Sequence, residues 1–378
     1  MTKNVKKGIG PMVWLFYLFI VFEIIYMITP FAFYYYSAYG PSLNFLNKSP
    51  LTAWLSGFFL PHFTESSSWI LNALHGAGWI LFLIGFVLFI IGAGQIYYAK
   101  FTRKGAVTGG LYKFVRNPQY TAFSIMGLGV LLVWPRFIVL VMFVTMLFVY
   151  YFLAKKEEKE CEAKFADDFK NYVKKTSMFI PGDSFILKRL PSLPKSGFKR
   201  VVSMLLLFIL VMGLFVITAS AIRNYSIASI STFYSRDSAA ISTVLMSKKD
   251  MEKIMKITFK HPEVRRRLAQ AGYGSGEKLL NYIVPLEWVL PDLPLDPASV
   301  SMRGHHQPKS SNPDKYKVLF TIAELSSENP VTGAEIIKST LSRVPIIVVK
   351  LNQATGEVFG IETPPMHVLW GDIPTPLF

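Results

Sequence analysis

The sequence predicts an all-α polytopic membrane protein of about five transmembrane helices, followed by an extramembrane α+β domain at its C-terminal end. Hydrophobic residues make up 52% of the 378 residues and charged residues only 17%, a balance too apolar for an ordinary soluble protein. The long runs without charge all lie before Arg223, and a region long enough for one further domain follows them. A bilayer is therefore the expected solvent for the first part of the chain.

Three single runs are long enough to cross a membrane, which takes about 20 mostly apolar residues for roughly 30 Å of hydrocarbon. They extend from Pro11 to about Tyr36, from Trp69 to Tyr98, and from Val201 to Ile222. The first run follows basic residues, as in a signal peptide, but its apolar core is too long and no small-residue cleavage site follows. We therefore expect it to be a retained helix.

A fourth apolar stretch extends from Arg116 to Lys155. It is interrupted by a single charged residue, Arg136, which directly follows Trp134-Pro135. This interruption predicts a tight hairpin of two helices, of which the first is short. The hairpin and the three single runs together give five membrane helices.

The positions of lysine and arginine predict the orientation, because cytoplasmic loops are enriched in these residues. The connection from Lys100 to Arg116 contains five basic residues and no acidic residue. Lysines also precede the first span and are frequent in residues 155–200. The loop 37–68 holds only one basic residue, Lys48. The amino terminus is therefore expected to be cytoplasmic and the C-terminal region extracytoplasmic, since long domains cross largely regardless of charge.

The formal net charge is +16, but the basic residues mostly flank apolar runs instead of forming a separate basic domain. This distribution favours membrane topology over a nucleic acid partner. The only cysteine, Cys161, excludes an intrachain disulfide, and no Cys/His cluster has the spacing of metal ligands. We therefore expect no metal site.

Two polar strings flank the predicted hairpin. The first reads GLYKFVRNPQY over residues 110–120, and the second begins with Glu157-Glu158 and ends with FIPG at residues 179–182. They resemble the G-L-Y-x-x-x-R-H-P-x-Y and E-E-x-x-L-x-x-x-F-G-x-x-Y-x-x-Y signatures of isoprenylcysteine carboxyl methyltransferases and the related phospholipid methyltransferases. Both strings occur in the family's order around a helical hairpin, so together they are more specific than either alone. The resemblance covers residues from about 70 to 182.

The resemblance implies a membrane methyltransferase that uses S-adenosyl-L-methionine as cofactor. It gives catalytic roles to Arg116, Glu157 and Glu158. For cofactor binding it implies a set drawn from both strings: Gly110, Tyr112, Arg116, Asn117, Pro118, Tyr120, Glu158 and Tyr172. These residue types suit the chemistry, because a guanidinium fork can bind the cofactor's carboxylate and carboxylates can bind its ammonium group, its ribose or an incoming amine.

The chain departs from the family pattern at several positions. Asn117 stands where the family usually has histidine, Met178 where it has arginine, and Ala166 where it has glycine. Asparagine offers a donor and an acceptor but does not titrate near neutrality, and methionine cannot pair with a carboxylate. The first two changes bear more on substrate recognition and activity than on cofactor binding.

The leading interpretation is carboxyl O-methylation of a lipophilic acceptor such as a prenylated cysteine. The alternative is N-methylation of a phospholipid amine, which needs a base that Glu157 or Glu158 offers. Asn117 and Met178 also leave open a catalytically silent membrane receptor or scaffold, and related membrane reductases share parts of this architecture. The expected partners are the lipophilic acceptor and the membrane lipids.

The chain is thus expected to have three parts. Residues 1–200 form a transmembrane methyltransferase-like domain with cytoplasmic site loops, residues 201–222 the fifth helix, and residues 223–378 an extracytoplasmic α+β domain of unknown function. In the last part we expect a helix from Lys249 to Ala271. Three β-rich runs follow it, at residues 316–325, 344–351 and 357–361.

Overall fold

The computed structural model describes residues 21, 25, 27–35, 43, 45–102, 107–182, 197–288, 313–326 and 331–364. The chain divides into two compact units. Unit 1 consists of residues 1–37, 78–131 and 141–212, and unit 2 of residues 38–77, 132–140 and 213–378.

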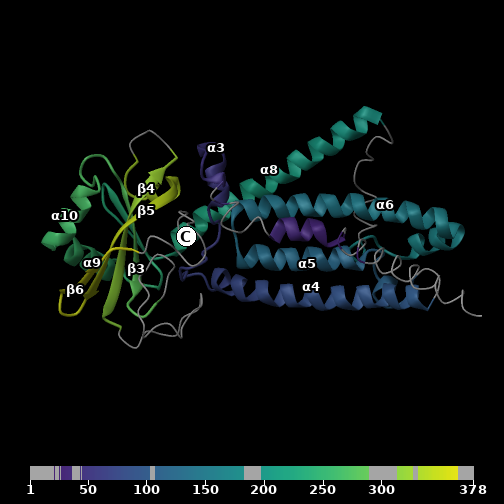
Figure 1. Ribbon diagram of the computed structural model, residues 1–378, viewed down its shortest axis with the longest axis horizontal. Helices are drawn as coiled ribbons and strands as arrows, with labels where there is room; N and C mark the ends of the chain where they lie inside the picture. Colours follow the sequence, from purple (N-terminus) through teal and green to yellow (C-terminus); the bar gives the residue numbers. More distant parts are fainter. Residues whose placement is uncertain are drawn as a thin grey trace, which may run out of the picture. The chain divides into compact units, whose positions relative to one another are not determined.

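Four long helices contain most of the described apolar sequence (Figure 1): α4 (Trp69–Phe101), α5 (Pro118–Val133), α6 (Phe137–Lys175) and α8 (Gly197–Ser229). Short helical elements are α3 (Pro50–Ala53), η1 (Trp54–Ser56) and η2 (Gly110–Lys113). Among the described residues, α4, α6 and α8 are long and apolar enough to cross a membrane, whereas α5 has 16 residues. These three helices confirm the prediction of an integral membrane protein.

The number of five spans stays a prediction. Most of the first expected span, from Pro11 to Tyr36, lies outside the described residues, and α5 is shorter than a usual span. The predicted hairpin is present, with Arg136 in the turn between α5 and α6. Pro118 begins α5, where its fixed φ suits a helix and its missing N–H costs no hydrogen bond.

Glycines let the helices of unit 1 approach each other closely. A Cβ atom at Gly85 on α4 would lie 2.7 Å from the carbonyl oxygen of Ala122 on α5, and one at Gly129 would lie 2.6 Å from that of Gly78. Both neighbours are backbone atoms, which cannot turn aside as a side chain can. Neither position therefore accepts a larger residue unless α4 and α5 separate.

Helix α6 has a sharp kink at Ala166, whose φ of 43° and ψ of −116° are not helical. These angles are close to those of the first central residue of a type II′ turn, a position that favours glycine. The kink lies within the polar half of α6, which begins at Lys155 and ends at Lys175. The chain thus makes a glycine-type turn with alanine, at the position where the resembled family has glycine.

In unit 2, the turn between α5 and α6 is fastened to the loop that precedes α4. Arg136 is buried, with its guanidinium 3.9 Å from the centroid of the Phe58 ring, and it donates a hydrogen bond to the carbonyl of Ser56. Backbone hydrogen bonds also join residues 57–59 to residues 135–137. The charge that interrupts the apolar stretch is therefore buried by a loop far away in sequence.

The C-terminal part of unit 2 is a six-stranded sheet with the strand order β1-β2-β3-β4-β5-β6. Its strands are β1 (Thr232–Tyr234), β2 (Ser238–Ser242), β3 (Leu279–Pro285), β4 (Lys315–Leu325), β5 (Thr340–Asn352) and β6 (Glu357–Glu362). β2 and β3 are parallel, and the other neighbours are antiparallel. Three helices accompany the strands: α9 (Lys248–Lys260), α10 (Pro262–Gln270) and α11 (Glu335–Ser339).

Both faces of this sheet are covered by apolar clusters. Successive side chains of a strand point to opposite faces, so neighbouring residues of β3 belong to different clusters. Leu279 and Ile283 of β3 join the cluster that packs against α9 and α10 (Figure 1). Leu280 and Tyr282 join the cluster on the other face, which also contains Ile227 at the end of α8 and residues of α11. The domain therefore has a core on each side of its sheet.

The predicted elements of this region are present, and others were not predicted. The helix expected from Lys249 to Ala271 is the pair α9 and α10, which Pro262 interrupts, and the three β-rich runs correspond to β4, β5 and β6. The sequence analysis missed β1, β2 and β3. The reason is clearest in β2, whose sequence SAAIS is buried along its whole length and has no apolar alternation.

Candidate functional site

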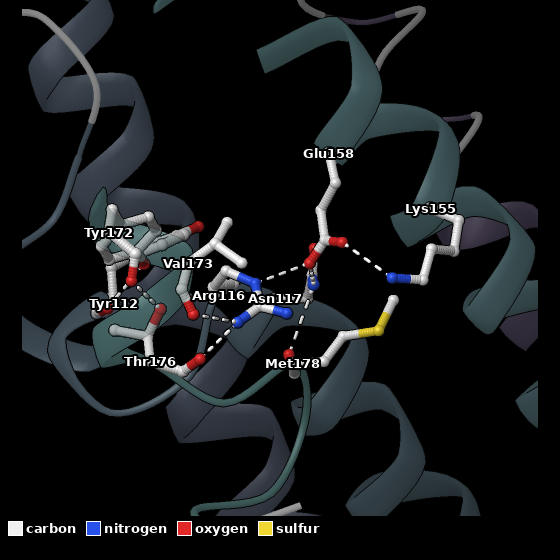
Figure 2. Close-up of polar contacts among 9 residues, drawn as sticks. All are labelled: Tyr112, Arg116, Asn117, Lys155, Glu158, Tyr172, Val173, Thr176 and Met178. Carbon is white, nitrogen blue, oxygen red and sulfur yellow. Dashed lines mark hydrogen bonds and ion pairs between the residues drawn. The ribbon is translucent and has the colours of Figure 1, made fainter. Parts of the chain in front are cut away.

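The two polar strings lie against each other in unit 1, although their contacting residues are 37 to 61 positions apart in sequence (Figure 2). The backbone N–H of Arg116 donates to the carbonyl of Ser177 at 2.9 Å, and that of Asn117 donates to the carbonyl of Met178 at 3.2 Å. The segment before α5 therefore runs beside the segment after α6 as a short pair of extended chains.

The side chain of Arg116 also connects the two strings (Figure 2). Its Nε donates to Oε1 of Glu158 at 2.7 Å, and its Nη1 donates to the carbonyl of Val173 at 3.3 Å and to that of Thr176. Only 10% of the Arg116 side chain and 13% of the Glu158 side chain is exposed. Water therefore screens this ion pair much less than an ion pair at the surface.

Glu158 is surrounded by donors. Besides Arg116, Lys155 contacts its second carboxylate oxygen at 3.2 Å, and Asn117 Nδ2 lies 3.5 Å from its first. Asn117 Nδ2 also donates to the backbone carbonyl of Met178 at 3.3 Å. The asparagine thus links both strings as a neutral donor, and Lys155 supplies a second cation beside Glu158.

Two tyrosines fasten the loop that contains η2. Tyr172 donates its hydroxyl to the carbonyl of Tyr112 at 2.6 Å, and Tyr112 donates its own hydroxyl to Oε1 of Gln119 at 2.6 Å. Burial raises the pKa of Tyr112 well above its usual value, so the hydroxyl stays protonated and remains a donor. These tyrosines therefore act first as parts of the scaffold.

Tyr120 and Glu157 form a second polar pair. The buried Tyr120 donates its hydroxyl to Oε1 of Glu157, and its ring stacks on Tyr150 with the centroids 4.9 Å apart. Glu157 itself is exposed, in contrast to Glu158. The two adjacent glutamates are thus in different environments: Glu158 is shielded between cations, and Glu157 is exposed.

Gly110 shows why the first string begins with glycine. Its φ is 60°, and a Cβ atom there would lie 1.9 Å from Nε2 of Gln95 on α4. The same Gln95 accepts a hydrogen bond from the N–H of Leu111 at 3.2 Å. Only glycine combines this backbone conformation with this close approach.

The predicted site residues all lie within unit 1, around the junction of the two strings, and their catalytic and binding roles stay predictions. Sequence reasoning missed the polar residues that hold them in place: Gln95, Gln119, Thr121, Lys155 and Thr176. Two of them could have been found from the sequence, because Gln95 and Gln119 are polar residues near the ends of apolar runs. The others are ordinary in their local sequence.

The apolar helices and the Arg116–Glu158 junction define the class of this protein. It is a membrane protein with a shielded polar site at the ends of its apolar helical segments. Residues 73–168 match the phospholipid methyltransferase family, which includes the isoprenylcysteine carboxyl methyltransferases. The match contains Arg116, Glu157 and Glu158 and confirms the resemblance for this part of the chain. No curated protein and no solved structure matches the chain.

Proposed function

We propose that the protein transfers a methyl group from S-adenosylmethionine to an amphiphilic acceptor at the membrane interface. The observation that carries this proposal is the junction of the two strings, where the shielded ion pair of Arg116 and Glu158 joins the loop before α5 to the end of α6. Both residues lie within the part of the chain that matches the methyltransferase family.

The accessible groups at the junction fit the cofactor. S-adenosylmethionine carries an ammonium group and a carboxylate, and its sulfonium sulfur supplies an electrophilic methyl group. The Nη2 edge of Arg116, which has no hydrogen bond among the described residues, would bind the carboxylate. The exposed backbone of Gly109 and Gly110 would allow a ligand to approach closely. Tyr112 and Asn117 are buried and would support these groups from within.

The charges at the junction favour an amine as acceptor. Glu157 is an exposed carboxylate that accepts a hydrogen bond from Tyr120. An ammonium group must lose a proton before it can attack a methyl group, and Glu157 is placed to accept that proton. We therefore place the phospholipid amine, which the sequence analysis ranked second, ahead of the carboxylate.

Carboxyl O-methylation stays the second candidate. A carboxylate acceptor attacks directly and needs no base, but it needs a nearby cation. The Nη2 edge of Arg116 is such a cation, but the cofactor's carboxylate would compete with an acceptor carboxylate for it. The two candidates therefore differ in their dependence on Glu157, which only amine methylation requires.

Binding of S-adenosylhomocysteine is the first test. Isothermal titration of the purified protein in detergent should show binding, and Arg116→Ala should weaken it by about ten- to a hundredfold through loss of one charge-assisted contact. Binding of NADPH alone would instead indicate a reductase, and binding of neither ligand a silent scaffold.

The acceptor is tested with two variants that remove the same charge. Glu157→Gln should lower methyl transfer to phospholipid amines by about a hundredfold or more and leave S-adenosylhomocysteine affinity nearly unchanged. The control is Glu160→Gln, which removes another exposed glutamate of α6 and should have little effect. If Glu157→Gln leaves amine methylation intact and farnesylcysteine is the better acceptor, carboxyl O-methylation is the reaction.

We further propose that the acceptor enters laterally from the bilayer, because apolar helices flank the junction. Gly127 and Gly129 are unsuitable positions to test this by substitution with tryptophan, since both pack against neighbouring helices. Leu128 is partly exposed on the same helix and is the better position. Leu128→Trp should impair methylation of extracted lipids and spare S-adenosylhomocysteine binding. Labelling of short water-soluble acceptors only, or equal lipid methylation by both proteins, would contradict lateral entry.

The sidedness of the site also remains a proposal, based on the basic residues of the connection before α5. Cysteines introduced near Lys104 and near Ser310, after Cys161→Ser, should react with a membrane-impermeant reagent from opposite sides of the membrane. Reaction from the same side would contradict an odd number of spans with a cytoplasmic amino terminus.

A further inference from the structure

Helix α9 of the C-terminal domain carries a line of four lysines. Lys249, Lys253, Lys256 and Lys260 are spaced by four, three and four residues, which places them on one face of a helix with 3.6 residues per turn. All four are exposed, and the opposite face of α9 is buried in the sheet's core. We call this face the lysine stripe; it is about 16 Å long at 1.5 Å per residue.

The lysine stripe is electrostatically unfavourable for the isolated domain. Like charges at spacings of three and four residues repel each other and destabilise a helix. Lys256 is paired with Glu252 at 2.7 Å, whereas Lys249, Lys253 and Lys260 form no ion pair with any residue that the structure describes. Residues 248–270, all of which are described, hold eight lysines and arginines against three acids. A bound polyanion would remove this repulsion.

The stripe is turned away from the segment that leads into the membrane helix. Helix α9 covers one face of the sheet, and the other face packs against Ile227 at the end of α8 (Figure 1). The stripe and the end of α8 therefore lie on opposite sides of the sheet.

We propose that the lysine stripe of α9 binds a linear phosphate polymer, such as a polyol phosphate or polyphosphate chain. A line of cations complements a chain of evenly spaced anions better than it complements a flat surface. The choice of lysine also fits, because an ammonium is a point charge without the fixed fork with which arginine pairs with single carboxylates.

The surroundings of the stripe argue against two other polyanions. Proteins that bind single-stranded nucleic acid add aromatic side chains on which bases stack, and helices that bind membranes add an apolar face. Between residues 246 and 270, all of them described, no large apolar or aromatic side chain is exposed. The stripe thus offers charge alone, which suits a polymer of phosphates without bases or tails.

The test is binding of the full chain in detergent to long-chain inorganic polyphosphate and to poly(glycerol phosphate), measured over a range of salt concentrations. Replacing all four lysines with glutamine should weaken binding by about a hundredfold and reduce the slope of log affinity against log salt by roughly three. The control replaces four exposed lysines of α6, Lys159, Lys170, Lys174 and Lys175, and should leave the affinity nearly unchanged. An equal loss in both variants would mean non-specific attraction to a basic protein and would overturn the proposal.

A gain of affinity provides a second test that misfolding cannot imitate. Glu252→Gln removes the partner of Lys256 and should strengthen polyphosphate binding by a few-fold. Unchanged or weaker binding in this variant contradicts the proposal. So does tighter binding of single-stranded DNA or polyglutamate at equal charge, or binding of phosphatidylglycerol vesicles in place of the soluble polymers.

Discussion

The two units obtain a defined structure in different ways. In the apolar window of α8 only 6% of the residues are buried inside the protein, whereas every residue of β3 is buried. Burial of apolar surface stabilises the sheet because water is the alternative, but lipid is as apolar as the helices and gives no such gain. In unit 1 the specific structure therefore depends more on polar contacts and on close approach at glycines.

The largest effect expected from this difference concerns two phenylalanines. Phe320 is fully buried in the sheet's core, so Phe320→Ala should destabilise unit 2 by about 3–5 kcal/mol. The matched change Phe86→Ala on α4, where 46% of the residue is exposed, should have a much smaller effect. Thermal unfolding followed by tryptophan fluorescence in detergent measures both; equal losses would mean that the comparison between the units is wrong.

The next effect concerns the ion pair at the junction of the strings. Arg116→Ala leaves the shielded carboxylate of Glu158 with weaker partners, and loss of one member of a buried pair costs about 3 kcal/mol or more. Lys155→Ala, whose side chain is 44% exposed, should cost less than about 1 kcal/mol. A double-mutant cycle with Glu158→Ala gives the coupling energy of each pair. A coupling as small for Arg116 as for Lys155 would show that the pair does not hold the junction.

A smaller effect is expected where helices meet at glycine. Gly129→Ala places a methyl group against backbone atoms of α4 and should destabilise unit 1 by about 1–3 kcal/mol. Gly94→Ala is the control, since a Cβ atom there has no neighbour within 4 Å and alanine favours the helix. Denaturant titration in detergent compares the two, and similar values would mean that the contact of α4 with α5 is not close in solution.

The smallest expected effect is an increase in the stability of unit 1. Ala166→Gly should raise stability by about 1 kcal/mol, because glycine adopts the backbone angles of this kink without strain, although it also makes the unfolded chain more flexible. The melting temperature should increase slightly. A decrease would indicate that α6 continues as an unbroken helix through residue 166.

Sequence reasoning was sufficient where the signal is local. Hydropathy located α4, α6 and α8, and the motif strings located the residues of the junction. The partners were beyond its reach, because Arg136 stacks on Phe58 and Arg116 meets Glu158 only after distant segments have come together. Strands such as β2 were missed for a related reason. Its small residues have no strand pattern of their own, and they form a buried strand because β2 pairs with β1 on one side and β3 on the other.

The joining of Arg116 and Asn117 to the backbone at Ser177 and Met178 also has a consequence for biosynthesis. A growing chain cannot complete the site when the first string leaves the ribosome; it must wait until the hairpin is inserted and the segment beyond α6 has been made. Chains that end at Lys175 would contain every membrane helix of the family-like region and both glutamates, yet lack the carbonyl groups that anchor the first string. The junction would therefore form late in translation, after the segment beyond α6 has been made.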